Sequence, residues 1–438
     1  MLIAPKFWKE LSSAPDDVVS SAIANTETMQ FKWTLQEDLL FKNFHVDKPL
    51  TKLTRSLGAR LPDIIEEAQM AISAYLGPFD DWKAIPVSDS SFKVIARTAN
   101  RLFFGPELAR NEEFLKLSIE YTTILFGGAN LIKNYPGILK TLVLRWRTDI
   151  VAANRLAKKH LAPVFKARMA EKKRYADQGQ PEIWDKMKPD DSVQWVLDAS
   201  PPEELNNLTS LTNRMLHINV AAVHTSTDNF LNTMQVLSLM PELQQELREE
   251  ILEIFTRDGG WTKQTLAHLK KVDSVMTETA RYCPGASTRT KRRVIKDFRL
   301  SDGTLIPRGL TVFWNSAPYA TDPEAVENGD KFDPLRFYKM RLEPGQENQH
   351  QWVMFSQVNT TFGTGRHACP GRFFAANEVK TVLVLFLMRY EWRMASNHTI
   401  QDIFQGTWHN ELRAARQDVV LEFKSLAMEM PEILKGIF

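Results

Sequence analysis

The stretch that most restricts how this chain can fold surrounds one cysteine, Cys369. Residues 362–374 read Phe-Gly-Thr-Gly-Arg-His-Ala-Cys-Pro-Gly-Arg-Phe-Phe, and a largely apolar segment continues to Met388. Pro370 suits the first position of a helix, because the N–H that proline lacks has no partner there. The sequence therefore predicts a glycine-rich loop that ends at Cys369 and a helix that begins directly after it.

A cysteine at the start of a helix has a chemistry that an ordinary core cysteine lacks. The helix presents backbone N–H groups and the positive end of its dipole, which lower the pKa of a thiol and favour thiolate. Thiolate binds soft metal centres such as haem iron. Gly363, Gly365 and Gly371 leave bare backbone that a flat macrocycle can approach. The alternative is a buried cysteine in a turn before a core helix, which is the more common role of a lone cysteine.

The complete pattern Phe-x-x-Gly-x-x-x-Cys-x-Gly over residues 362–371 resembles the haem-binding loop of the cytochrome P450 family. The resemblance implies that Cys369 is the axial ligand of the iron of haem b, and that Phe362 and Gly365 contact the cofactor. Most members carry arginine two residues before the cysteine. This chain has His367 there, as many fungal members do, and the resemblance implies that His367 faces a haem propionate.

Further propionate contacts are less marked in the sequence. By its offset before Asp297, Arg292 is implied as one such contact, with Arg289, Arg293 and a solvated strand as the alternatives. The family's Trp-x-x-x-Arg contact is absent from the first half of the chain. Lys52 and Arg55 lie in its neighbourhood, where a solvated helix face explains them equally well.

A long helix is predicted from about Glu203, with Pro202 just ahead of it. Its apolar residues recur at spacings of three and four, and Thr225 continues the series Leu208, Leu211, Met215, Ile218 and Ala222. Residues 221–226 resemble the family's oxygen-activation motif, with His224 in place of the usual acid. The resemblance implies that the Thr225 hydroxyl contacts dioxygen and relays protons. For His224 it leaves two roles open, proton relay or packing.

Two further motifs resemble the family's buried charge cluster. Glu278 and Arg281 are three residues apart, on one face of a predicted helix. Downstream, residues 334–337 read Pro-Leu-Arg-Phe, with leucine where the family usually has glutamate. The resemblance implies that Glu278 lies between Arg281 and Arg336, and that these three residues have a structural role.

The order of these motifs predicts one cytochrome P450-like domain over residues 1–438, with the resemblance spanning about residues 5–423. The fold class is mainly α with a small β region (α+β). Residues 1–140 are predicted to form helices and loops. A hairpin is predicted around residues 301–303 and a strand over 310–314. The resemblance also implies an N-terminally shortened chain, because eukaryotic members normally begin with a membrane anchor, a hinge and the first strands.

Composition excludes several other classes of protein. A net charge of +2 gives no indication of the basic surface that binds nucleic acid. Two cysteines indicate a reducing compartment, and Cys283 is expected in the core. The longest apolar run, residues 382–388, is far shorter than the ~20 residues of a membrane span. We therefore expect no membrane span in this chain and a place on the cytoplasmic side, with endoplasmic-reticulum association only in a full-length form.

The resemblance implies monooxygenation, in which one atom of O2 enters a substrate and the other leaves as water. Electrons would come from NADPH through a separate reductase, because no glycine-rich nucleotide loop lies between a strand and a helix. The expected substrate walls, residues 219–222 and 284–288, are mostly small or apolar. They favour a lipophilic substrate, and the resemblance to fungal members implies secondary metabolism with a terpenoid or related scaffold. The alternatives are a haem-thiolate rearrangement enzyme without a reductase, a non-catalytic haem-binding protein, and a helical interaction protein without haem.

Overall fold

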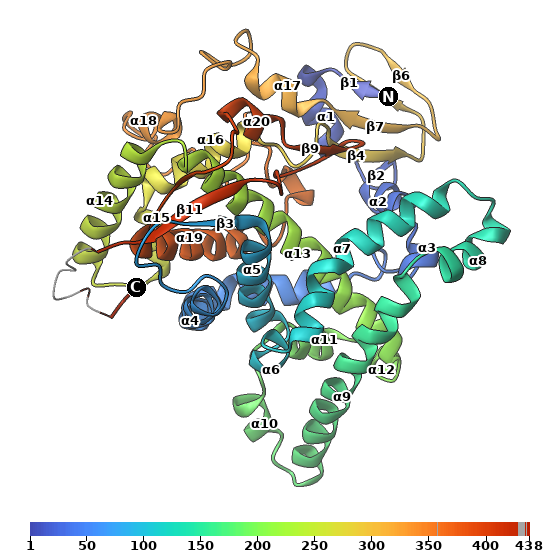
Figure 1. The fold of residues 1–438 in the computed structure, drawn as a ribbon. Helices are drawn as coiled ribbons and strands as arrows, with labels where there is room; N and C mark the ends of the chain where they lie inside the picture. Colours follow the sequence, from blue (N-terminus) through green and yellow to red (C-terminus); the bar gives the residue numbers. More distant parts are fainter. Residues whose placement is uncertain (357, 428–433, 435) are drawn as a thin grey trace. The chain divides into compact units, whose positions relative to one another are not determined.

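A computed structural model of the chain describes residues 1–356, 358–427, 434 and 436–438. Helices make up most of these residues, and the strands form four small sheets (Figure 1). This confirms the predicted fold class, mainly α with a small β region. The chain divides into two compact parts, which we call the larger part and the smaller part. The larger part comprises Met1–Ala24, Leu57–Ile95 and Thr225–Phe438, and the smaller part Asn25–Ser56 and Ala96–His224.

The four-stranded sheet of the larger part has the order β1-β7-β4-β2. Strand β1 (Leu2–Ile3) pairs in parallel with β7 (Thr311–Trp314), and β4 (Arg289–Val294) pairs antiparallel with β7 and with β2 (Val19–Ser20). The sequence predicts only helices and loops over residues 1–140, so β1, β2 and β3 (Lys83–Pro86) correct that prediction. Strands of two to four residues are too short to show a period-two pattern.

The other sheets are smaller. Strand β11 (Val420–Ser425) lies between β3 and β8 (Tyr390–Met394), and β9 (Thr407–His409) pairs with β10 (Leu412–Ala414). The predicted hairpin is present as β5 (Phe298–Arg299) and β6 (Leu305–Ile306). Its turn includes Gly303, whose φ of 87° suits glycine. The strand predicted over 310–314 is β7.

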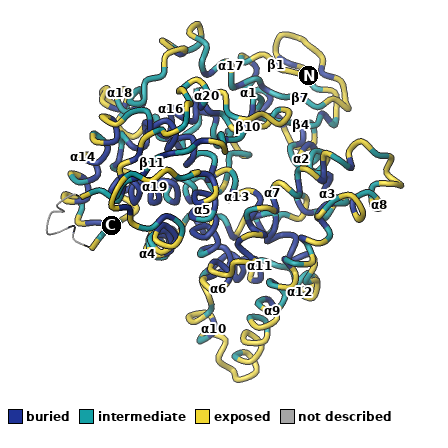
Figure 2. The backbone as a smooth tube through the Cα atoms, in the orientation of Figure 1, coloured by how far each residue is buried: buried dark blue, intermediate teal, exposed yellow. Residues whose placement is uncertain are grey.

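Helix α19 (Arg372–Arg389) is the central helix of the larger part (Figures 1 and 2). Its residues from Val382 to Met388 are all apolar and all buried, as expected for a helix segment that is apolar on every side. The Phe386 ring lies 5.1 Å from the ring of Phe230, which belongs to α13 (Leu208–Leu237). The remaining helices of this part are α1 (Trp8–Ser13), α14 (Pro241–Asp258), α15 (Lys263–His268), α16 (Lys270–Tyr282), α17 (Ser316–Thr321), α18 (Arg336–Met340) and α20 (Ile400–Gln405).

The smaller part is helical. Helix α7 (Glu112–Lys133) packs on α9 (Ile150–Asp177), where the Tyr121 hydroxyl bonds to Asn154 Oδ1 at 2.5 Å. The shorter helices are α3 (Phe31–Thr34), α6 (Pro106–Ala109), α8 (Gly137–Arg147), α10 (Pro181–Met187), α11 (Ser192–Ala199) and α12 (Pro202–Leu205). The division between the parts falls within α2 (Ser21–Met29), α4 (Phe44–Tyr75), α5 (Val87–Phe103) and α13.

The long helix α13 begins later than the sequence predicts. Glu203 belongs to the separate one-turn helix α12, and α13 starts at Leu208. The side chain of Asn207 accepts a hydrogen bond from the Ser210 N–H at 3.0 Å, which is the bond of an N-cap residue. The cap therefore fixes the start of α13. Within the described ranges, no helix is both long enough and apolar enough to cross a bilayer.

Candidate active site

The Cys369 loop joins a 3-10 turn, η2 (Gly365–His367), to helix α19. The Phe362 carbonyl accepts the Cys369 N–H at 2.6 Å. Gly363 and Gly365 have φ of 68° and 61°, in the left-handed region where other residues are strained. The loop therefore needs glycine at both positions to present Cys369 as it does.

Helix α19 begins at Arg372, with Gly371 as its N-cap, and not at Pro370 as the sequence predicts. The Arg372 N–H bonds back to the Cys369 carbonyl at 3.4 Å, so Pro370 and Gly371 form a turn before the helix. A Cβ at position 371 would lie 3.9 Å from the Cys369 sulfur. The start of the helix is thus close to the sulfur even though the helix begins two residues later.

The ionisation of Cys369 differs from the expectation. Burial raises the pKa of the Cys369 thiol, although the N–H groups of Gly371 and Arg372 and the Arg372 charge oppose this. For the Cys369 thiol of the chain without a bound metal, the prediction of a lowered pKa is therefore wrong. The thiol gives up its proton when a metal ion replaces it, as metal ligands commonly do. Cys283 is 4% exposed, and burial raises its pKa to about 11, as expected for a core cysteine.

A buried cation lies in the same part of the protein. Arg292 on β4 is 6% exposed, and its Nη1 donates to the neighbouring Lys291 carbonyl at 2.9 Å. The pKa of Arg292 is lowered to about 10, chiefly by burial, with the Asp16 charge opposing this shift and the Arg366 charge adding to it. Across the described ranges, no carboxylate forms a salt bridge with this guanidinium. Because an unpaired buried charge is costly, the site suits an anionic ligand group such as a haem propionate.

His367 is tied to the N-terminal segment. Its Nε2 lies 2.8 Å from Asp16 Oδ1, and its Nδ1 lies 3.3 Å from the Ser21 hydroxyl. The neighbouring Arg366 bonds to the Ala14 carbonyl. Burial lowers the pKa of His367, and the Arg292 charge adds to this shift. Sequence reasoning did not find Asp16 and Ser21, because they are about 350 residues away and carry no motif.

These residues fit the haem that the sequence implies. The Cys369 sulfur could serve as a metal ligand, Gly363 and Gly365 carry no side chains, and Arg292 is a buried cation without a salt bridge among the described residues. The basic residues in the region of the missing Trp-x-x-x-Arg motif have other surroundings. Lys52 pairs with Asp190 at 3.1 Å, and Arg55 is exposed.

Helix α13 carries the residues of the implied oxygen-activation motif. Thr225 is exposed, whereas Ser226 and Thr227 are buried. Asn229 donates its side-chain amide to the Thr225 carbonyl at 2.8 Å. His224 Nε2 lies 2.6 Å from the Ile119 carbonyl on α7, and burial lowers the pKa of His224. A neutral His224 that donates from Nε2 is therefore held against α7.

The structure brings the three residues of the charge cluster together. Glu278 forms a bidentate pair with Arg281, from Oε1 to Nη2 at 2.6 Å and from Oε2 to Nε at 2.8 Å. Arg336 Nε lies 3.3 Å from Glu278 Oε1. Arg281 Nη1 also donates to the carbonyls of Ala320 and Gly329 at 2.7 and 2.6 Å. The cluster thus joins α16 and α18 to the segment between them.

Comparisons with known proteins show the family of the whole chain. The family model described as Cytochrome P450 matches residues 16–416. Cytochrome P450 monooxygenase AN1598 of Emericella nidulans is 33% identical over 398 residues, which cover 90% of this chain and 73% of that protein. Cytochrome P450 monooxygenase 110 of Postia placenta is 32% identical and covers 92% and 79%. Cytochrome P450 monooxygenase olcJ of Penicillium canescens is 30% identical and covers 93% and 76%.

Solved structures show the same fold. Retinoic acid bound cyanobacterial CYP120A1 aligns with a TM-score of 0.69 at 17% identity, over 97% of this chain and 89% of that one. The heme domain of cytochrome P450DA aligns with a TM-score of 0.70 at 16% identity, over 96% and 86%. The family model and the curated relatives imply a haem-dependent enzyme. The chain belongs to the cytochrome P450 family, and its curated relatives are monooxygenases.

Proposed function

We propose that this protein is a haem-thiolate monooxygenase that inserts one atom of O2 into a lipophilic organic substrate. A terpenoid-like scaffold in fungal secondary metabolism is the proposed substrate class. The observation that carries the proposal is the Cys369 loop, which presents a sulfur beside the start of α19. The two compact parts are proposed to act as one catalytic domain over residues 1–438.

The proposed haem contacts come from this chain's own residues. Cys369 binds the iron, Phe362 and Gly365 lie against the macrocycle, and Arg292 and His367 face the propionates. A bound haem supplies the iron at which O2 is reduced and split. His367 already has Asp16 as a partner, so its role is to hold the loop as well as to contact the cofactor. Glu278, Arg281 and Arg336 are proposed to keep the surrounding structure in place.

Thr225 is proposed as the residue that passes protons to the oxygen being reduced. Its side chain lies on the exposed side of α13, next to the exposed Ala221 and the half-buried Ala222, where small side chains leave room. His224 is proposed to assist by holding this turn of α13, because its Nε2 is engaged by the Ile119 carbonyl. A direct proton relay through His224 remains the second proposal for that residue.

The electrons are proposed to come from NADPH through a separate reductase on the cytoplasmic side of the endoplasmic reticulum. The lipophilic substrate class is supported by the small and apolar residues at 219–222 and 284–288. The test is reconstitution of the haem-loaded protein with a fungal NADPH-dependent reductase and a panel of terpenoids. We expect substrate-dependent NADPH consumption and a product that is heavier by one oxygen atom.

A haem-thiolate rearrangement enzyme is the second candidate. One observation favours it, since His224 replaces the usual acid beside Thr225 and its Nε2 is not available to a substrate. This candidate predicts product formation without NADPH or a reductase. The same reconstitution therefore separates the two, because a product that forms equally well without NADPH contradicts the monooxygenase proposal.

A further inference from the structure

A second buried charge cluster lies in the larger part, separate from Glu278. It consists of Asp273 on α16, Lys380 on α19 and Arg341, and we call it the Asp273 cluster. Asp273 Oδ1 lies 2.5 Å from Lys380 Nζ, and Asp273 Oδ2 lies 3.5 Å from Arg341 Nη1. Asp273 and Arg341 are 3% exposed and Lys380 is 6% exposed. The two cations therefore hold the two oxygens of one buried carboxylate in a fixed orientation.

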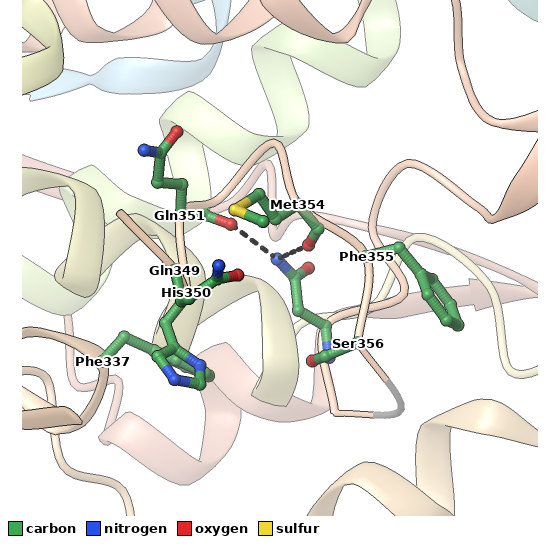
Figure 3. A pocket seen from close by; sticks show the side chains of 8 residues that line it. Phe337, Gln349, His350, Gln351, Met354, Phe355 and Ser356 are labelled. Atoms are coloured by element: carbon green, nitrogen blue, oxygen red, sulfur yellow. Dashed lines mark hydrogen bonds between the residues drawn. The ribbon is translucent and has the colours of Figure 1, made fainter. Parts of the chain in front are cut away.

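The Asp273 cluster contacts the backbone of a tryptophan loop, residues 349–356. Asp273 Oδ2 accepts the Trp352 N–H at 2.9 Å. Asn359 fastens the same loop, because its side-chain amide donates to the carbonyls of Trp352 and Met354, each at 2.9 Å, and of Gln351 at 3.4 Å. Figure 3 shows the bonds to Gln351 and Met354. The carboxylate and the amide thus fix the backbone on either side of Trp352.

The Trp352 side chain connects this loop to the Cys369 loop. Its ring lies 5.0 Å from the Phe362 ring, at an angle of 64°, in the edge-to-face arrangement that aromatic pairs favour. The Phe362 carbonyl in turn accepts the Cys369 N–H at 2.6 Å. Trp352 is 1% exposed, and its indole N–H has no hydrogen-bond partner among the residues that the structure describes. The ring is therefore placed by its backbone and by packing alone.

We propose that Asp273, oriented by Lys380 and Arg341, is a positioning residue for the Cys369 sulfur. It acts through Trp352 and Phe362 and does not touch the cofactor. A carboxylate is required because a neutral side chain would leave two buried cations without an anion. The inference rests on the proposed role of Cys369 as the iron ligand, and it assigns a function to a cluster that the haem contacts do not include.

The test uses the haem-loaded protein and the variant Lys380→Met, which removes one cation but keeps the length of the side chain. Lys380→Arg is the conservative variant. Arg248→Met is the matched control, because Arg248 is 4% exposed and donates to the carbonyls of Leu387 and Tyr390 at 2.8 and 3.0 Å. It thus removes another buried cation that supports helix α19, without a described contact to Asp273 or to residues 349–356.

Two quantities are measured for each variant. One is the rate at which the reduced, carbon-monoxide-bound protein loses the red-shifted Soret band of thiolate ligation. The other is hydrogen exchange of the backbone amides in residues 362–369. For Lys380→Met we expect about tenfold faster loss of the band, as for other outer-shell partners of metal ligands, with faster exchange in that segment. Lys380→Arg should restore both, and Arg248→Met should change neither by comparison.

Trp352→Leu provides a second variant if Lys380→Met does not accumulate in folded form. It keeps the Asp273 cluster and the backbone N–H but removes the ring that contacts Phe362, so it should also lose the thiolate band faster. The inference is overturned if both variants lose the band at the rate of Arg248→Met. If the parent binds haem but lacks the thiolate band, the assignment of Cys369 as the iron ligand fails, and this inference fails with it. If the parent shows the band, only this inference is at stake, so the two failures are distinguishable.

Discussion

At the scale of single residues, Thr225 is the position where a substitution should change catalysis without changing the fold. It is exposed on α13 and contributes no iron ligand. Thr225→Ala should leave the fold and the haem content nearly unchanged. Because the proposed proton donor is lost, more of the O2 should leave as hydrogen peroxide and less product should form per NADPH consumed. The measurement is the ratio of product to NADPH, together with peroxide release.

The control for Thr225→Ala must be another exposed threonine. Thr227 lies on a different face of α13 but is fully buried, so a substitution there would disturb packing. Thr209 is exposed near the start of α13, where it bonds to Lys158 at 2.7 Å, and Thr209→Ala should leave coupling unchanged. If Thr225→Ala forms as much product per NADPH consumed as the parent does, Thr225 is not the proton donor.

The buried carboxyl of Glu378 should make the free energy of unfolding depend on pH. Burial raises the pKa of this carboxyl on α19 to about 8 from 4.5, while the nearby Ser226 hydroxyl opposes the shift without reaching hydrogen-bond geometry. Its folded pKa is above its unfolded pKa, so the folded state binds more protons between these two values. The free energy of unfolding should therefore fall as the pH rises from about 4.5 to about 8, by up to ~1.4 kcal/mol per pH unit.

The variant Glu378→Gln cannot ionise and should lack this contribution. The free energy of unfolding of the variant, relative to that of the parent, should therefore be higher at pH 8 than at pH 4.5. Denaturant unfolding of both proteins across this pH range measures the effect. Parallel stability curves for parent and variant would show that Glu378 does not titrate as its burial implies.

At the scale of helices and loops, the Glu278 cluster should determine whether haem is retained. Glu278 and the Arg281 side chain are fully buried, so Arg281→Ala or Glu278→Ala leaves a buried charge without its partner, at a cost of about 3–5 kcal/mol. We expect lower haem content and lower soluble yield, and not only slower turnover. Haem content per protein and the unfolding midpoint are the measurements.

An exposed pair with the same spacing provides the control. Glu171 and Arg174 on α9 are also three residues apart, at 2.6 Å, but their side chains are about half exposed. Glu171→Ala should change stability by less than ~1 kcal/mol. A Glu278 variant that resembles Glu171→Ala in haem content and melting would contradict the buried structural role.

Some helices, loops and side-chain pairs can be predicted from the sequence, and others cannot. The Phe362–Cys369 pattern and the Glu278–Arg281 spacing are local, so the sequence predicts both the loop and the pair. The start of α13 was missed because it depends on the Asn207 cap and not on apolar periodicity. The partners of His367, Asp16 and Ser21, lie about 350 residues away, and β1 is two residues long. Neither leaves a pattern in the sequence.

At the scale of the whole molecule, the other proposals depend on the proposed role of Cys369, which is to hold haem iron as a thiolate. The fold and the family are consistent with this role, and a bound iron would replace the thiol proton whose pKa burial raises. Other features, such as the buried Arg292 and the proposed roles of Thr225 and Asp273, have their functional meaning only if this role is correct. A test of Cys369 is therefore a test of all of them.

The most direct measurement is the absorption spectrum of the reduced protein with carbon monoxide, for the parent, Cys369→Ser and Cys283→Ser. We expect the red-shifted Soret band of thiolate ligation in the parent and in Cys283→Ser, because Cys283 is a buried core residue. Cys369→Ser should lack the band, since a serine hydroxyl stays protonated and binds iron poorly. A Cys369→Ser protein that keeps the band would show that Cys369 is not the thiolate ligand.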